Sequence, residues 1–98
     1  MSSYSFSDEA VKDINNICEY VARQNYQAAS QLFDAIRKKC NLVAGFPNMG
    51  KSYSILATNL RGFVVEDYIV FYYPREDGID IVRVVSGYRD LESLFLSD

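Results

Sequence analysis

The chain has 98 residues, of which 49% are hydrophobic and 14% aromatic, and its net charge is −3. This size and composition predict one domain over residues 1–98 with a single core, and they exclude a disordered polypeptide. No apolar run approaches the roughly 20 residues of a membrane-spanning helix. The N-terminus has no basic segment followed by an apolar stretch, so we expect a cytoplasmic protein rather than a secreted one.

The N-terminal half predicts a short strand followed by two antiparallel helices. Aromatic residues alternate with serines over residues 3–7, which is the period of a strand. Ser7 fits the N-cap of a helix over residues 8–24, where apolar residues recur at spacings of three and four. Asn25 interrupts this pattern and can cap a second helix, which should end near Gly45.

Residues 45–52, GFPNMGKS, match the letter pattern of a phosphate-binding loop. The context of the match is wrong, because a predicted helix precedes it where such a loop requires a strand. Pro47 also stiffens the segment, and β-type sequence follows it. We therefore do not predict nucleotide binding at this position.

The C-terminal half is dominated by strand patterns, which cover residues 60–65, 68–73 and 79–85. An Asp77-Gly78 pair marks a tight hairpin turn between the last two strands. A short helix could follow over residues 90–96. The element order β-α-α-β-β-β predicts an α+β fold, with an antiparallel sheet and the helical hairpin packed on one of its faces.

Alternation along the strands assigns side chains to the two faces of this sheet. In the middle strand, Tyr68 and Tyr72 should share one face and Phe71 and Tyr73 the other. In the last strand, one face should carry Ile79, Ile81 and Arg83 and the other Asp80, Val82 and Val84. One aromatic pair should therefore pack against the helices, and Arg83 should be flanked by apolar side chains and require a partner.

The sequence contains no histidine and two cysteines, Cys18 and Cys40. The absence of histidine excludes His-based zinc sites, Ser-His-Asp triads and Cys-His pairs. Both cysteines occur at apolar helix positions, which is typical of buried, inert thiols rather than a disulfide. We expect neither a metal nor a cofactor. The acidic net charge also argues against direct binding of nucleic acid, because neutralising phosphates requires a basic surface.

Five segments, taken together and in order, resemble the RelE/ParE superfamily of bacterial toxins from type II toxin–antitoxin modules. They are YSFSDEAVKDINNICEYVA, FPNMG, LRGF, YIVFYYPRE and IDIVRVVSGYRD. The resemblance covers nearly the whole chain. The two long helices and the Arg-Asp ending are more similar to the ParE branch than to the RelE branch. Ser86 stands where many ParE sequences have histidine.

The resemblance implies a toxin that inhibits growth by binding a cellular target, in the first place DNA gyrase, without catalysis of its own. It also implies a ParD-like antitoxin that neutralises the toxin in a hetero-oligomer. One alternative is a RelE-like mRNA endonuclease that acts on the ribosome. Another is a homologue that has lost toxicity and serves only as a binding partner.

The residues expected to contact the target or the antitoxin are Arg61, Arg83, Tyr88, Arg89, Tyr68 and Tyr72. In the RelE-like alternative the catalytic residues would be Arg61, Arg83, Tyr88 and Lys51. There the tyrosine would stack on a base while the cations stabilise charge on the scissile phosphate. The ParE-like interpretation assigns no catalytic residue.

Each of these residues also has a structural interpretation. Arg61 and Arg83 could be sheet residues that pair with acids such as Glu66 or Asp80. Lys51 could be an ordinary loop residue. The tyrosine and arginine that follow Gly87 could pack under the expected tail helix and pair with its first acid. The sequence leaves these alternatives open.

Overall fold

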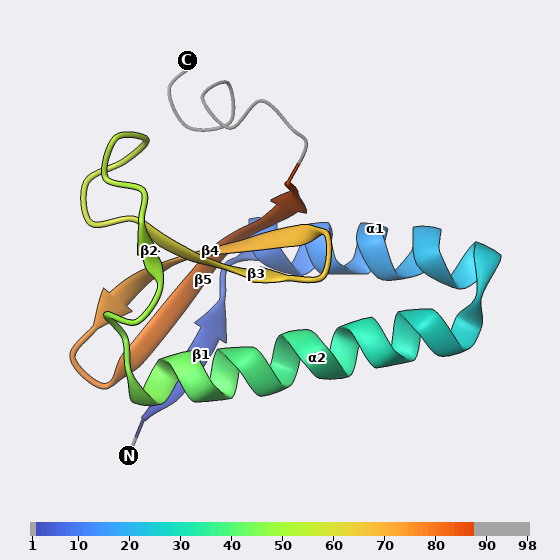
Figure 1. Cartoon of the computed structure of the whole chain (residues 1–98), viewed down its shortest axis with the longest axis horizontal. Helices are drawn as coiled ribbons and strands as arrows, with labels where there is room; N and C mark the ends of the chain where they lie inside the picture. Colours follow the sequence, from blue (N-terminus) through green and yellow to red (C-terminus); the bar gives the residue numbers. More distant parts are fainter. Residues whose placement is uncertain (1, 88–98) are drawn as a thin grey trace.

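The computed structural model describes residues 2–87, which form a sheet and a helical hairpin (Figure 1). In chain order the elements are β1 (Ser3–Phe6), α1 (Asp8–Gln24), α2 (Tyr26–Gly45), β2 (Lys51–Ser52), β3 (Arg61–Val65), β4 (Tyr68–Arg75) and β5 (Gly78–Ser86). Tyr88, Arg89 and the expected tail helix lie outside the described residues. Within residues 2–87, neither helix has the length and apolar character that crossing a membrane requires.

The helices begin and end where the sequence predicts. The Ser7 side chain accepts a hydrogen bond from the Ala10 amide at 3.1 Å, and Asn25 Oδ1 accepts one from the Ala28 amide at 3.1 Å. These caps satisfy amides that lack a partner within the first turn of each helix. Helix α2 ends at Gly45, as expected. The predicted α+β class with an N-terminal helical hairpin is confirmed.

The sheet has five strands in the order β1-β5-β4-β3-β2. Neighbouring strands are antiparallel except that β1 runs parallel to β5, so the expected antiparallel sheet is in fact mixed. The helical hairpin carries the chain from β1 to the opposite edge of the sheet, where β2 lies. Strands β3, β4 and β5 then follow, each antiparallel to the strand before it, and lead back to β1. Strand β5 therefore arrives beside β1 running in the same direction.

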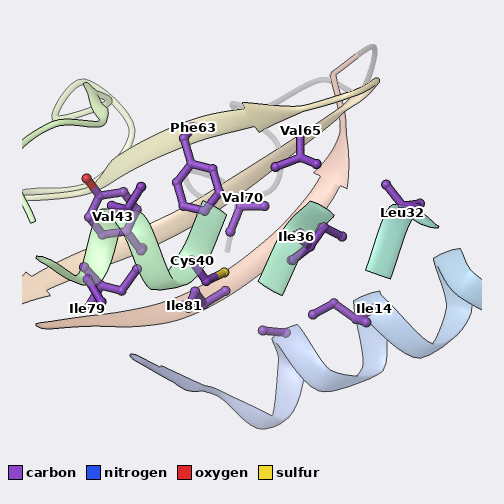
Figure 2. Close-up of a cluster of buried hydrophobic side chains, with 14 residues drawn as sticks. Ile14, Leu32, Ile36, Cys40, Val43, Phe63, Val65, Val70, Ile79 and Ile81 are labelled. Atoms are coloured by element: carbon purple, nitrogen blue, oxygen red, sulfur yellow. The ribbon is translucent and has the colours of Figure 1, made fainter. Parts of the chain in front are cut away.

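The main hydrophobic core lies between the helical hairpin and the sheet (Figure 2). Helix α2 contributes most of the buried helical side chains: Leu32, Ile36, Cys40, Val43 and Ala44. From the sheet, Tyr72 faces this core fully buried and Tyr68 lies at its margin. The predicted division of the aromatic residues is confirmed, because Phe71 and Tyr73 belong to the opposite face.

The opposite face of the sheet is covered by the segment between β2 and β3. The buried residues of this second core are Leu56 and Leu60 from the segment and Ile69, Phe71 and Val85 from the sheet. Tyr53 packs edge-on against Phe71 with ring centroids 5.0 Å apart. Phe71 has no exposed surface. The second aromatic set is thus largely core rather than an open binding platform.

A register irregularity in β5 changes which residues face the helices. Phe71 is opposite Arg83 and Tyr72 is opposite Ile81, so Val82 has no partner in β4. The expected alternation is therefore wrong beyond this point, and Val84 joins the helix-facing core instead of the opposite face. The register likewise pairs Arg83 with a residue of the opposite face. An extra residue of this kind shifts the alternation by one position.

Candidate functional site

Two neighbouring side chains of the sheet hold the loop that follows α2. Arg61 and Tyr72 are directly opposite each other in β3 and β4. The Tyr72 hydroxyl donates to the Pro47 carbonyl at 2.7 Å and accepts from the Gly50 amide at 3.0 Å. Arg61 Nη1 donates to the carbonyls of Asn48 at 3.1 Å and Gly50 at 2.6 Å. The proline-to-glycine loop is therefore fixed against the sheet.

This arrangement explains why a glycine stands at position 50. A Cβ atom there would lie 2.4 Å from the Tyr72 hydroxyl and 2.9 Å from the Gly62 carbonyl oxygen. Burial raises the pKa of Tyr72, while the Gly50 amide and the positive charge of Arg61 oppose this rise. Tyr72 has no exposed surface. The prediction that Tyr72 is a contact residue is therefore corrected, because its ring packs in the core and its hydroxyl bonds to the loop.

Beside Arg61 lies a polar pocket with a volume of about 280 Å³. Its lining residues are Asn48, Ser52, Ser54, Asn59, Leu60, Arg61 and Pro74. Asn59 adopts a left-handed backbone conformation with φ of 68°, which asparagine tolerates better than most residues. Arg61 supplies the pocket's single charge, and the other polar lining groups are hydroxyls and amides.

Arg83 lies two strands away and is engaged by a carboxylate of helix α1. Its Nε donates to Asp13 Oδ2 at 2.7 Å and its Nη2 donates to Oδ1 at 3.2 Å. The Val84 amide donates to the same carboxylate at 2.9 Å. The Asp13 hydrogen bond raises the pKa of Arg83, against the lowering effect of burial. Arg83 therefore pairs with an acid, as its structural interpretation has it, but the acid is Asp13 and neither Glu66 nor Asp80.

Asp13 closes the edge of β5 beyond the end of β1. The β1–β5 pairing ends at Phe6 and Ile81, and the start of α1 then covers the remaining edge. The sequence did not predict this role of Asp13, because no local pattern joins residues 70 positions apart. A charged residue directly before the buried Ile14 was the available signal.

Arg75 forms a second polar network, which the sequence pattern did not predict. Its guanidinium donates to Asp77 at 2.9 Å, to Ser3 at 2.6 Å, to Ser5 at 3.1 Å and also to Asp80. The Ser5 hydroxyl, followed by Arg75, lowers the pKa of Asp80 despite partial desolvation. This network joins β1 to the β4–β5 hairpin, and its two carboxylates, Asp77 and Asp80, more than neutralise the charge of Arg75.

Lys51 points away from Arg61. In the short β2–β3 ladder Ser52 is opposite Arg61 and Lys51 is opposite Gly62, so the two cations lie on different faces. The Lys51 ammonium lies 5.3 Å from the centroid of the Tyr53 ring. Among the described residues, Arg61, Arg83 and Lys51 therefore do not converge on one centre. Tyr88 and Arg89 lie outside the described residues, so their roles stay predictions.

Tyr68 remains accessible at the margin of the helix-facing core. Tyr68 also lines a shallow apolar pocket with Val64 and Ile69, at the acidic turn formed by Glu66 and Asp67. Burial, followed by the charge of Asp67, raises the pKa of Tyr68. Its role as a contact residue stays a prediction.

An apolar groove runs between α1 and α2, with a volume of about 380 Å³. Its lining residues are Ile14, Asn15, Cys18, Glu19, Ala22, Tyr26, Ala29, Ser30 and Phe33. The two large rings at its rim are unusually exposed, at 80% for Tyr26 and 43% for Phe33. In Figure 1 this part of the hairpin extends past the sheet. The groove is therefore an apolar surface that the sheet does not cover.

The two cysteines are free thiols with different environments. Burial raises the pKa of Cys40 to about 12, so this thiol is inert, as expected. Burial also raises the pKa of the half-buried Cys18, which lines the helical groove. Within residues 2–87, no group of three or more cysteine, aspartate or glutamate side chains is arranged to hold a metal ion.

The fold of this chain matches that of a chain from a solved toxin–antitoxin system. A solved chain of the "Chromosomal ParDE TA system from P. aeruginosa" superimposes with a TM-score of 0.71, covering 88% of this chain and 96% of that chain. Its sequence identity is 18%, so this likeness shows the fold alone. No curated protein matches the chain. The family model for the "ParE toxin of type II toxin-antitoxin system, parDE" matches residues 4–91, and the chain therefore belongs to the ParE toxin family.

Proposed function

We propose that this ParE-type toxin arrests growth in the bacterial cytoplasm by binding DNA gyrase, and that a cognate ParD-like antitoxin neutralises it. The family match over residues 4–91 carries this proposal. A binding role is also favoured over RNA cleavage by the placement of the cations. Cleavage requires cations gathered around one phosphate, whereas Arg83 is neutralised by Asp13 and Lys51 lies on another face from Arg61.

The groove between α1 and α2 is the surface that we assign to the antitoxin. Tyr26 and Phe33 stand at its rim, and Ala22 and Ala29 leave room between them. Such a groove can accept the apolar face of an amphipathic helix, which folds as it binds. The occupant we propose is therefore a helical segment of the antitoxin.

Expression of the chain without antitoxin tests the target. We expect growth arrest with an induced DNA-damage response and intact mRNA. Arrest with cleaved mRNA would replace the gyrase proposal by the RelE-like one. Normal growth despite abundant folded protein would instead identify a non-toxic binding partner. With purified components, the toxin should inhibit supercoiling by gyrase, and the same amount of toxin should leave mRNA intact on translating ribosomes.

A matched pair of variants tests the groove. Phe33→Asp places a charge in the groove, whereas Ile55→Asp places the same charge on an 83% exposed apolar residue in another region. Both variants should remain toxic, but only Phe33→Asp should escape neutralisation when the antitoxin is co-expressed. Equal neutralisation of the two would contradict the assignment of the groove.

A further inference from the structure

The charge of Arg61 has no counterion among residues 2–87. Each of the other described arginines has a carboxylate at salt-bridge distance; these arginines are Arg23, Arg37, Arg75 and Arg83. Arg61 instead donates only to two backbone carbonyls, and both bonds come from Nη1. The Nε–Nη2 edge of its guanidinium therefore donates to no acceptor within the described part of the chain.

Backbone bonds also fix the orientation of this guanidinium. Arg61 is anchored to the carbonyls of Asn48 and Gly50, and its neighbour Tyr72 anchors the same loop. A ligand that binds there does not have to order a free side chain, so little conformational entropy is lost on binding. The free edge has the two parallel N–H donors that match the two oxygens of a carboxylate.

We propose that the Arg61 pocket is a binding site for a carboxylate group. The pocket is polar, with a volume of about 280 Å³, and offers the amides of Asn48 and Asn59 and the hydroxyl of Ser54 beside the guanidinium. One positive charge balances the single negative charge of a carboxylate. A phosphate carries nearly two negative charges at neutral pH and would leave one unbalanced. The site is independent of whether gyrase is the target.

The test is a titration of the full chain with sodium acetate at constant ionic strength, followed by NMR at the Arg61 Nε–H and the backbone amide of Asn59. We expect saturable shifts that chloride does not cause, and weaker binding of inorganic phosphate than of acetate. A short peptide with one aspartate and blocked ends distinguishes the sources. Tighter binding of the peptide than of acetate would indicate a carboxylate presented by a protein, and tighter binding of acetate would indicate a free small acid.

Two variants and one control separate the pocket from general electrostatics. Arg61→Gln removes the cation but also loosens the loop, so Asn59→Asp serves as a second variant that keeps Arg61 and supplies an internal carboxylate. Each should weaken acetate binding by about tenfold or more, as expected for loss of a charge-assisted pair. Arg37→Gln, which changes the charge equally on an exposed face of α2, should leave binding unchanged.

Three results would overturn the proposal. The first is a shift that grows linearly with acetate and equals the shift with chloride. The second is tighter binding of phosphate than of acetate. The third is equal binding by the wild type and the Asn59→Asp variant.

Discussion

Arg61 and Arg83 stand on the two strands that flank β4, yet their surroundings differ in one decisive respect. Arg83 meets the carboxylate of Asp13, whereas Arg61 meets only backbone carbonyls. Arg83 joins a helix to the sheet with its charge balanced. Arg61 orders a loop and keeps its charge available. The same residue type on similar strands is therefore structural in one region and a candidate binding group in the other.

Removal of Asp13 should have the largest effect on stability. In Asp13→Ala the partly buried Arg83 and the Val84 amide lose their shared acceptor. We expect the free energy of unfolding to fall by about 3 kcal/mol, as when one partner of a buried pair is removed. Denaturant unfolding measures this change. The control Asp34→Ala, which breaks an exposed pair, should change stability by less than about 0.5 kcal/mol. Equal losses of stability in the two variants would show that Arg83 behaves as an ordinary surface residue.

Gly50→Ala should have the next largest effect. The new Cβ would overlap the Tyr72 hydroxyl and the Gly62 carbonyl, so the loop must move off the sheet. We expect a loss of about 2 kcal/mol from overpacking, measured by thermal or denaturant unfolding. The control is Gly45→Ala, where the nearest atom to the new Cβ is Ser2 Oγ at 3.9 Å. A Gly50→Ala variant as stable as this control would show that the loop is not held tightly.

Tyr72→Phe isolates the hydroxyl that binds the loop. It removes the bonds to the Pro47 carbonyl and the Gly50 amide while keeping the ring in the core. The expected loss is about 1–2 kcal/mol, because a buried amide is left without its acceptor. Hydrogen exchange at the Gly50 amide should accelerate as well. The control Tyr73→Phe changes a tyrosine of the opposite face, and its exchange at Gly50 should match the wild type.

Asp80→Asn should have the smallest effect, and one that depends on pH. Because the Ser5 hydroxyl and Arg75 lower the pKa of Asp80 in the folded chain, its carboxylate stabilises the fold above the ordinary aspartate pKa. That contribution is lost as the pH falls through the lowered folded pKa. The difference in Tm between wild type and variant should therefore shrink from about pH 6 to about pH 3. A constant difference would contradict the shift.

The helices and the aromatic faces could be predicted because their signals are local. Ser7 and Asn25 cap the helices where they were expected, and the alternation of Tyr72 and Phe71 assigns them to the correct faces. The alternation failed at Val84, because an unpaired residue in β5 shifts the register. Alternation alone does not reveal a bulge, which depends on how two strands meet.

The sequence by itself determined the α+β class, the caps and turns, and membership in the ParE family, because these depend on residue type, spacing and order. Only the tertiary structure decided the roles of the individual polar residues. It buried Tyr72, joined Asp13 to Arg83 across 70 positions, and left Arg61 without a carboxylate partner among the described residues. The role of a charged side chain depends on its neighbours in space, and those neighbours come from distant parts of the chain.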